Sequence, residues 1–332
     1  MTTPTKISYG FIALLLLLVG LLHLSTPFIT VLFAYFALTK LQFGQRKRLA
    51  VALFLVLVAA LGYGSYYFAK HAYVQLPRIA DETIPVAIGY AEKNGIDLPF
   101  KDYGSLKELA MESMSGKLAG VGRFVRKAVV EIVSLIIGLV VAVSLFISAR
   151  FDLEHGQHAL KDNLYSLSWV EIARRFGTFY QSFSAVMGAQ ITISLINTLL
   201  TAVFLTWNHF HYVLVIVVVT FLCGLLPIIG NVISNTLIVA VAFTLSPQLA
   251  LLALVFLVVI HKLEYFLNSK IIGDRIKNPM WLTLLGLILG EKLMGIPGMI
   301  LAPVVLHYIK VEASRSKVSD LSTDNRASPT PA

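Results

Sequence analysis

A few charged and amide side chains stand beside long apolar stretches of this chain, at positions where an ion or a polar solute could bind. Glu264 follows a run from Phe176 to Ile260 that contains no Asp, Glu, Lys or Arg. Charged groups are costly in lipid, so a carboxylate at the edge of such a run is a candidate for binding a cation or an amine. Glu264 and Asn268 would share one face of a continuing helix, with Lys270 close by. An ordinary interfacial carboxylate, paired with Lys262 or Lys270, is the alternative.

Two amides, Asn231 and Asn235, follow a break in the apolar pattern at Pro227 and Gly230. Their spacing of four residues places them on one face of the next helix, close to its start. Unpaired backbone N–H groups and the positive end of the helix dipole are available there, so an anion or polar group could bind. A helix cap combined with an interhelical hydrogen bond would account for the same residues.

Three further polar residues are candidates for a transport or ion-binding role. Glu291, next to Lys292, separates two apolar pieces and is either functional or a solvated loop tip. Gln190 and Asn197 belong to a polar stripe on an earlier apolar helix, whose members recur at spacings of three and four: Gln190, Ser194, Asn197, Thr198 and Thr201. We expect this stripe to face protein or a water-lined path.

The composition indicates an integral membrane protein, whose first partner is the lipid bilayer. Hydrophobic residues make up 57% and charged residues 14% of the 332 residues, and the mean hydropathy is +0.79, whereas soluble domains average about 25% charged residues. The net charge of +9 comes from basic residues that flank apolar runs, where they set orientation. No basic patch with interleaved aromatics indicates a nucleic-acid partner. The single cysteine, Cys223, excludes a disulfide within the chain.

Enzyme motifs are absent from the sequence. It contains no H-E-x-x-H, no G-x-S-x-G and no G-x-x-x-x-G-K-[ST], which argues against a zinc protease, a hydrolase elbow and an ATP-driven pump. His209 and His211 lie two residues apart but have no further ligands nearby in the sequence. We therefore expect no catalytic residue, no cofactor and no metal site.

Residues 1–69 are predicted to form N-terminal transmembrane helices. The uncharged run from Ile7 to Thr39 is too long for one helix, and Ser25-Thr26-Pro27 is the expected break, with Ser or Thr capping the second helix. A cleaved signal peptide over residues 1–24 is the alternative. Leu49 to Ala69 is the third span, and the basic cluster before it places that loop in the cytoplasm. Both termini are then expected to be cytoplasmic.

Residues 70–128 have a mixed-charge composition and are predicted to form a small extracytoplasmic helical insert. An apolar stripe between Leu106 and Leu118 either covers its own neighbours or makes an oligomer contact. Residues 129–313 are the expected transmembrane transport core, which includes a cytoplasmic amphipathic segment over 150–183. The tail, 314–332, is rich in Ser, Thr and Pro and is expected to be disordered.

Two places in the core predict broken or re-entrant helices. Between Tyr212 and Leu245, the chain supplies about 51 Å of helix, less than the roughly 60 Å that two crossings need. Met280 to Gly290 and Leu293 to Ile309 are also short, at about 16 and 25 Å. The second pair suggests a hairpin that bends at Gly295, Pro297 and Gly298, and a plain turn at the outer surface is the alternative. The fold class is therefore an all-α, polytopic transmembrane protein.

The chain resembles the autoinducer-2 exporter family of bacterial membrane transporters. Its overall layout is similar from residue 7 to 310, and the specific motifs lie in residues 188–303: the Pro-Ile-Ile-Gly turn at Pro227 to Gly230, then Glu264, Asn268, Lys270, Gly273, Pro279, Gly290, Gly295, Gly298, Ala302 and Pro303. Asn231 and Ser269 stand where the family usually has proline. The resemblance implies a homo-oligomeric transporter, with some members assigned to export of a small signalling molecule and others to exchange of sodium for protons.

The sequence as a whole predicts a secondary transporter of the bacterial cytoplasmic membrane, which exports a small polar solute or signalling molecule. Apolar runs interrupted by Gly and Pro, as at Pro227 and Pro297, indicate a site built from broken helices. A sodium (or lithium)/proton antiporter is the first alternative. The second is a membrane scaffold that transports nothing, which would need the polar residues only as helix caps.

Overall fold

The computed structural model describes residues 2–44, 46–93, 95, 104, 121–148, 163–226, 229–272 and 279–315, and the regular structure in these ranges is helical. In chain order the helices are α1 (Thr3–Leu21), α2 (Ser25–Lys40), α3 (Lys47–Lys93), α5 (Val121–Ser148), α6 (Leu164–Trp207), α7 (Val213–Gly224), α8 (Ile229–Leu245), α9 (Pro247–Ile272), α10 (Met280–Met294) and α11 (Ile296–Arg315). Within the described ranges, six helices are long and apolar enough to cross a membrane. This confirms the all-α polytopic fold class.

The N-terminal apolar run divides into two helices, α1 and α2, as predicted, but the break lies at residues 22–24, just before the predicted Ser25-Thr26-Pro27, which already belongs to α2. The connection between Leu21 and Ser25 is only a few residues long, and His23 in it has a left-handed backbone, with φ 54°. The expected side-chain cap by Ser or Thr is wrong, because Leu24 occupies the N-cap position and Ser25 is already helical. The backbone alone therefore makes this turn.

Helix α3 continues well beyond the predicted span. It runs without interruption from Lys47 to Lys93, with Pro77 and Pro85 inside it, and its 47 residues correspond to about 70 Å. Residue 70 is therefore not a break in secondary structure. The second half packs on α7 and α8, where Ile79 joins the buried core around Ile216 and Ile238. Most of the insert beyond Lys93, including the apolar stripe, lies outside the described residues.

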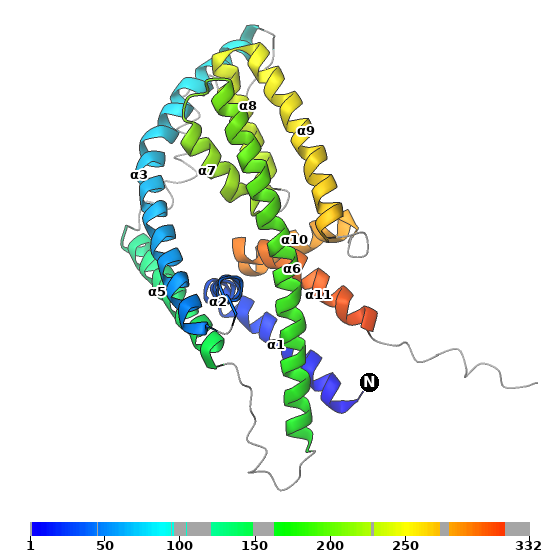
Figure 1. Ribbon diagram of the computed structural model, residues 1–332. Coiled ribbons are helices and arrows are strands. Elements are labelled where there is room, and N and C mark those ends of the chain that lie inside the picture. Colours follow the sequence, from blue (N-terminus) through cyan, green and yellow to red (C-terminus); the bar gives the residue numbers. More distant parts are fainter. Residues whose placement is uncertain are drawn as a thin grey trace, which may run out of the picture.

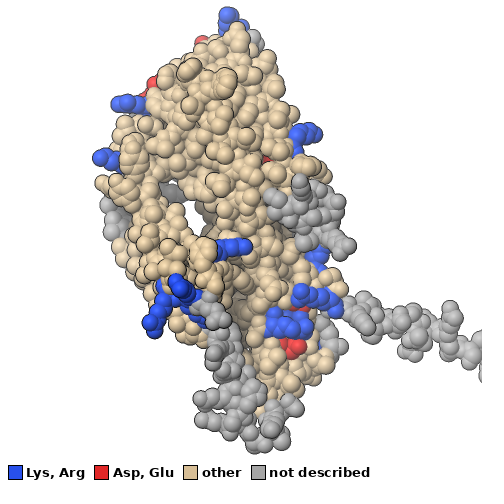
Figure 2. All heavy atoms as spheres, viewed as in Figure 1, with Lys and Arg blue, Asp and Glu red and all other residues tan. Residues whose placement is uncertain are grey.

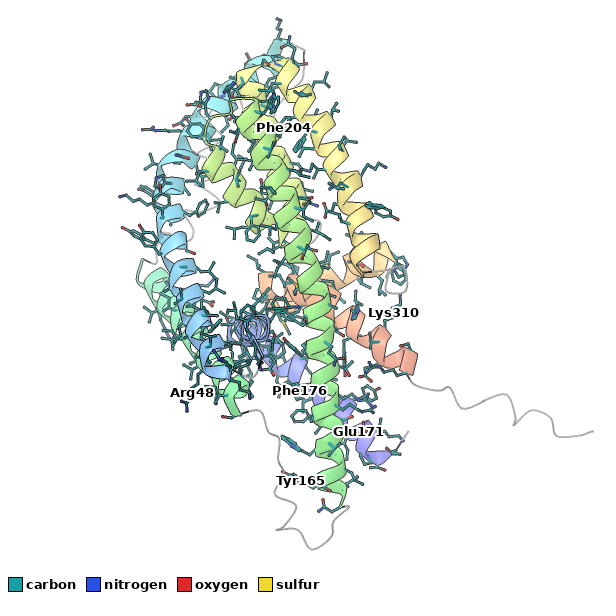
Figure 3. All side chains as sticks on the ribbon, viewed as in Figure 1. Arg48, Tyr165, Glu171, Phe176, Phe204 and Lys310 are labelled. Atoms are coloured by element: carbon teal, nitrogen blue, oxygen red, sulfur yellow. The ribbon has the colours of Figure 1, made fainter. Side chains whose placement is uncertain are left out.

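Helix α6 connects two groups of helices. Its 44 residues span about 66 Å. Figure 1 shows α3, α7, α8 and α9 around its upper half, and α1, α2, α10 and α11 beside its lower half. Phe204 marks the upper half, where its ring stacks on Phe256 at 4.2 Å, and Phe176 marks the lower half (Figure 3). Residues 163–183 of the predicted amphipathic segment form the start of α6, and residues 149–162 lie outside the described part.

At both predicted breaks the chain forms two separate helices in place of one long helix. Helix α7 has 12 residues and α8 has 17, or about 18 and 26 Å, each below the roughly 30 Å of a hydrocarbon core. Helices α10 and α11 pack on each other as a hairpin. Its bend is smaller than expected, because Gly295 is the C-cap of α10 and Ile296 to Gly298 already belong to α11. The hairpin's depth in the membrane stays a prediction.

The surface carries the apolar side chains that lipid contact requires. Ile136 and Val140 on α5 are more than half exposed, as are Val255 and Val258 on α9. Figure 2 shows a face that is largely uncharged, with Lys and Arg side chains mainly along its margins and lower part. Ser314 and Arg315 still belong to α11, while 316–332 lie outside the described residues.

Candidate functional site

A carboxylate and an amide meet between α8 and α9. The Nδ2 of Asn231 donates to both oxygens of Glu264, at 3.1 and 2.9 Å. The Glu264 side chain is 17% exposed, so protein encloses most of it. A charged group in such a place needs hydrogen-bond partners, because desolvation penalises it otherwise. Asn231, in the first turn of α8, which begins at Ile229, supplies one of these partners.

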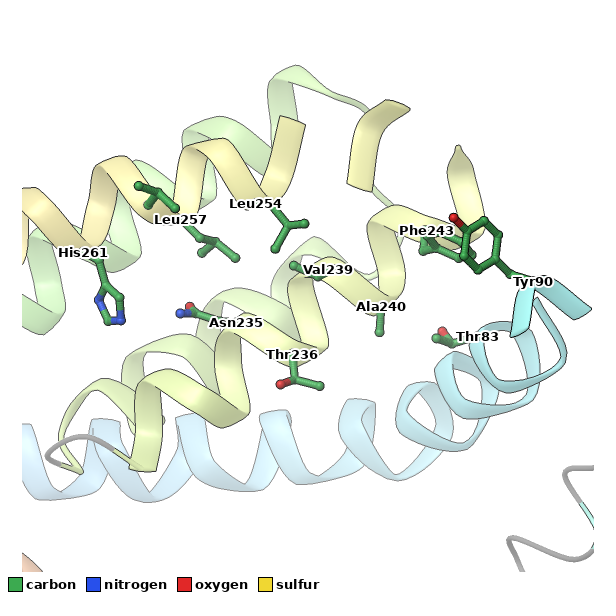
Figure 4. A pocket seen from close by; sticks show the side chains of 11 residues that line it. Thr83, Tyr90, Asn235, Thr236, Val239, Ala240, Phe243, Leu254, Leu257 and His261 are labelled. Atoms are coloured by element: carbon green, nitrogen blue, oxygen red, sulfur yellow. The ribbon is translucent and has the colours of Figure 1, made fainter. Parts of the chain in front are cut away.

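His261 completes this group and was not anticipated as a site residue. Its Nδ1 lies 3.5 Å from an Oε of Glu264, one turn earlier on α9. Asn235, one turn after Asn231 on α8, faces the same region, because Asn235 and His261 line one end of a pocket (Figure 4). The structure therefore gathers Asn231, Asn235, His261 and Glu264. The sequence signal for His261 was its position three residues before Glu264, at helical spacing.

Local sequence positions the two helices that carry these residues. Helix α9 begins with Pro247, whose missing N–H is tolerated in a first turn, and the Ser246 hydroxyl accepts from the Leu249 N–H at 3.0 Å. Helix α8 starts close against the end of α7, since a methyl group at Gly230 would overlap the carbonyl of Cys223. Only glycine permits this approach. Pro227, the residue expected to break the helix, lies outside the described residues.

Two side chains of the polar stripe on α6 donate hydrogen bonds to carbonyl groups in the last turn of α7. Gln190 Nε2 donates to the carbonyl of Gly224 at 2.6 Å, and Ser194 Oγ donates to the carbonyl of Phe221 at 2.9 Å. The last carbonyls of a helix have no intrahelical partner, so these two side chains satisfy groups that the break leaves open. For Gln190 the contact thus favours a structural role, in which it stabilises the end of α7, over a role in binding a solute.

Asn197 and Thr198 lie farther along the same stripe and differ from Gln190. The Oδ1 of Asn197 and the Oγ1 of Thr198 are buried without a hydrogen-bond partner among the described residues. A buried polar atom in this state is a place where water or a solute could bind. The stripe therefore faces protein at its start and carries unpaired polar atoms farther on.

Glu291 is not brought to the Glu264 group. It lies in the last turn of α10, 49% exposed, with an oxygen 3.7 Å from Nζ of the 78% exposed Lys292. Exposed pairs of this kind contribute about 0–1 kcal/mol. The geometry favours the solvated hairpin tip over a binding role.

Glycines set the geometry of the hairpin itself. Gly295 has φ 64° and ψ −144°, a conformation that is almost restricted to glycine. Gly290 and Gly298 face each other so closely that a methyl group on either would overlap the other's carbonyl. Pro297 occupies the first turn of α11, where its missing N–H costs little, and Pro303 lies inside that helix.

Besides Pro227, three further predicted residues lie outside the described part, wholly or in their side chains. The side chains of Asn268 and Lys270 lie outside the described residues, although their backbone belongs to α9. Gly273 is outside them altogether. Around Glu264, the described partners are Asn231, across the helix interface, and His261, along α9. The alternative pairing with Lys262 is not among the described contacts, and Lys270 lies outside the described side chains.

The sequence interpretation missed a buried ion pair at the other end of α6. Arg175 donates to Glu312 on α11, and each of the two side chains is 4% exposed. Tyr9 on α1 also donates to Glu312, at 3.0 Å, and its ring lies 4.1 Å from the Arg175 guanidinium carbon. Opposite charges beside apolar runs were visible in the sequence, but nothing there indicated which helices would meet.

The described part of the chain holds no cluster of three or more His, Cys, Asp or Glu side chains suited to a metal ion. The site's chemistry is instead that of one carboxylate with two amides and an imidazole. Such a set can bind a small cation, a proton or the N–H groups of an organic solute.

Comparisons with known proteins identify the family of this chain. A family model described as AI-2E family transporter matches residues 9–314. A protein of Bacillus subtilis (strain 168), named "Putative transport protein YdbI", is 29% identical over 179 residues, which cover 52% of this chain and 51% of that protein. The match thus spans about half the length of that relative.

Proposed function

Because this chain belongs to the AI-2E family of membrane transporters, we propose that it is a secondary transporter whose substrate site is the group around Glu264. The substrate in this proposal is a small organic solute with a polar group. Its movement in this proposal is outward, as in those family members that are assigned to export. The family assignment alone does not specify a site, a substrate or a direction, so the proposal depends on the contacts described above.

The observation that carries the proposal is the partly buried carboxylate at a helix break. Glu264 is mostly enclosed by protein and is held by Asn231, just after the break between α7 and α8. Polar groups next to broken apolar helices are the usual position of substrate sites in secondary transporters. The Asn231 side chain makes an interhelical hydrogen bond, and the group that accepts it is a carboxylate, which supports a binding role for Glu264.

The two breaks also supply joints at which the core could move. Helix α7 ends at Gly224 and α8 begins at Ile229, and α10 and α11 meet at Gly295. Short helices joined in this way can change their mutual angle without losing their own hydrogen bonds, and alternating access requires such a change. This favours a transporter over a scaffold, for which breaks have no use.

Cation/proton exchange is the second candidate, favoured by a specific contact. His261 Nδ1 lies 3.5 Å from Glu264, so two groups that can carry protons stand side by side. A carboxylate next to an imidazole can exchange a proton for a metal cation, as in proton-coupled transporters.

Purified full-length protein in proteoliposomes tests the function. One assay follows efflux of a panel of labelled amines, polyols and furanones, and a second follows internal pH after sodium or lithium is added. Flux in the first assay supports solute transport, and a pH change in the second supports antiport. Correctly oriented, monodisperse protein that shows neither would refute secondary transport and favour the scaffold.

We also propose a cytoplasmic-membrane location with both termini in the cytoplasm. The exposed apolar faces of α5 and α9 would then contact lipid or other copies in a homo-oligomer. In a Cys223→Ser background, Gln248→Cys in the exposed first turn of α9 should react with an impermeant thiol reagent in intact cells. Gln42→Cys should react only after lysis. The reverse pattern would overturn this orientation.

A further inference from the structure

A pocket of about 590 Å³ lies between α3, α8 and α9, adjacent to the Glu264 group. Its polar end is formed by Asn235 and His261 (Figure 4). Its walls are mostly apolar, with Val239 and Ala240 on one side and Leu254 and Leu257 on the other, and Thr83 and Thr236 also line it. The far end is closed by Tyr90 and Phe243, whose rings meet edge to face at 4.9 Å.

The shape of the pocket fits an elongated solute. Asn235 and Phe243 both line it and are separated by eight positions on α8, which corresponds to about 12 Å along the helix axis. Binding sites for small organic molecules have this character, with mostly apolar walls and a few polar groups that fix orientation. A bare metal cation would gain nothing from an apolar wall of this length.

The charge around the polar end favours a cationic group. Glu264 lies one turn from His261 on α9, and it accepts from Asn231, which lies one turn from Asn235 on α8. Glu264 lies just outside the pocket lining, so a solute group between Asn235 and His261 would be about one helical turn from its carboxylate. An ammonium group is attracted to that charge and can donate to amide and imidazole acceptors, whereas an alcohol gains only the hydrogen bonds and a carboxylate is repelled.

The open side of the pocket suits a solute that partitions into the bilayer. Both α3 and α9 pack on α8, and Leu254 and Val258 line the pocket while remaining 48% and 59% exposed. An apolar rim of this kind faces lipid in a membrane protein, so a solute with an apolar body could reach the pocket laterally.

We propose that this pocket binds organic amines in which a protonated amino group is joined to an apolar body, with a total length of up to about 12 Å, the span that the helix rise gives for the pocket. This substrate class rests on the proposed function, because it deepens the assignment of the Glu264 group. The amine lies at Asn235 and His261, next to Glu264, and the apolar body lies along Val239 and Ala240.

Binding of matched probes to the full-length protein in nanodiscs tests the proposal. The probes are 2-(1-naphthyl)ethylamine, the corresponding alcohol 2-(1-naphthyl)ethanol and the acid 1-naphthylacetate, with partition into empty nanodiscs subtracted. We expect the amine to bind at least tenfold more tightly than the alcohol, and the acid more weakly than both. Equal affinity for amine and alcohol would overturn the proposal and indicate a neutral apolar ligand such as a lipid chain.

Variants of the pocket locate the binding. Ala240→Phe fills the middle of the pocket and should weaken amine binding at least tenfold. Its matched control, Val232→Phe, adds an aromatic ring at a position on α8 that is 63% exposed and should leave binding unchanged. Glu264→Gln should remove the preference for amine over alcohol. Unchanged amine binding in Ala240→Phe would place the ligand elsewhere and refute the proposal.

The two proposals fail in distinguishable ways. Tight, Ala240-dependent amine binding with no flux in proteoliposomes would refute the transport function and leave the ligand class standing. Solute or cation flux without any amine preference in the binding assay would refute the ligand class and leave the transport function standing.

Discussion

The buried ion pair between Arg175 and Glu312 should contribute far more to stability than the exposed pair beside it. Both side chains of the buried pair are 4% exposed, whereas Arg174, whose Nη2 lies 2.7 Å from Glu171, is 52% exposed. Removing one member of a buried pair costs about 3–5 kcal/mol, because a charge is left without its partner. An exposed pair is worth about 0–1 kcal/mol.

A hydrogen bond from Tyr9 lowers the loss of unfolding free energy that we expect for Arg175→Met. Tyr9 still donates to Glu312 in that variant, and one such hydrogen bond to a remaining charge offsets about 1 kcal/mol. We therefore expect Arg175→Met to lower the free energy of unfolding by about 2–4 kcal/mol. The neighbouring control, Arg174→Met, should cost about 1 kcal/mol or less.

Reversible unfolding of the full-length protein in mixed micelles, followed by helix content, measures these differences. The double variant Arg175→Met with Glu312→Leu removes both charges, so it should be less destabilised than the sum of the two single variants. Equal losses for Arg175→Met and Arg174→Met would refute the reasoning, as would strict additivity in the double variant.

Three further predictions concern the helix ends and the hairpin. Gly298→Val should destabilise the protein in the same unfolding assay, since its Cβ would overlap the Gly290 carbonyl, while Gly10→Val, with nothing within 4 Å of its Cβ, should be close to neutral. Gln190→Leu leaves the Gly224 carbonyl without its donor and should cost about 1–3 kcal/mol, whereas a loss no larger than that of Leu195→Ala on the exposed face would contradict the capping role. The hydrogen bond that Tyr212 donates to Glu82 at 2.7 Å raises the pKa of Tyr212 above its usual value, so the contact stabilises the fold below pH of about 10 and is lost as the phenol ionises. Tyr212→Phe should therefore lose less stability than the wild type at alkaline pH, and identical pH profiles would contradict this.

Apolar periodicity and turn residues predicted most of the fold. The break near Pro27, the short helices around Pro227 and the hairpin at Gly295 all follow from helix lengths and from the backbone limits of Pro and Gly. The sequence did not predict that α3 continues to Lys93. The change to mixed charge after residue 70 indicates a change of surroundings, and it does not indicate that the helix ends. Pro77 and Pro85, which usually break helices, lie inside it.

The candidate site was predictable in part. The helical spacing of Asn231 and Asn235 identified the face of α8 that carries them, and Glu264 stood out as a charge at the edge of an apolar run. Their meeting depends on how α8 and α9 pack, which a helical period does not specify. For the same reason, the sequence could not distinguish Gln190, which caps α7, from Asn197 on the same stripe.

The most direct test of the account is the flux of Glu264→Gln in proteoliposomes, with Glu291→Gln as the matched control. A glutamine at 264 keeps an oxygen that can accept from Asn231, so folding should be retained while the charge is lost. Glu291 is 49% exposed at the hairpin tip, and neutralising it should leave flux unchanged. The account predicts at least a tenfold lower initial rate for Glu264→Gln alone. Wild-type flux in a normally assembled Glu264→Gln protein would contradict it.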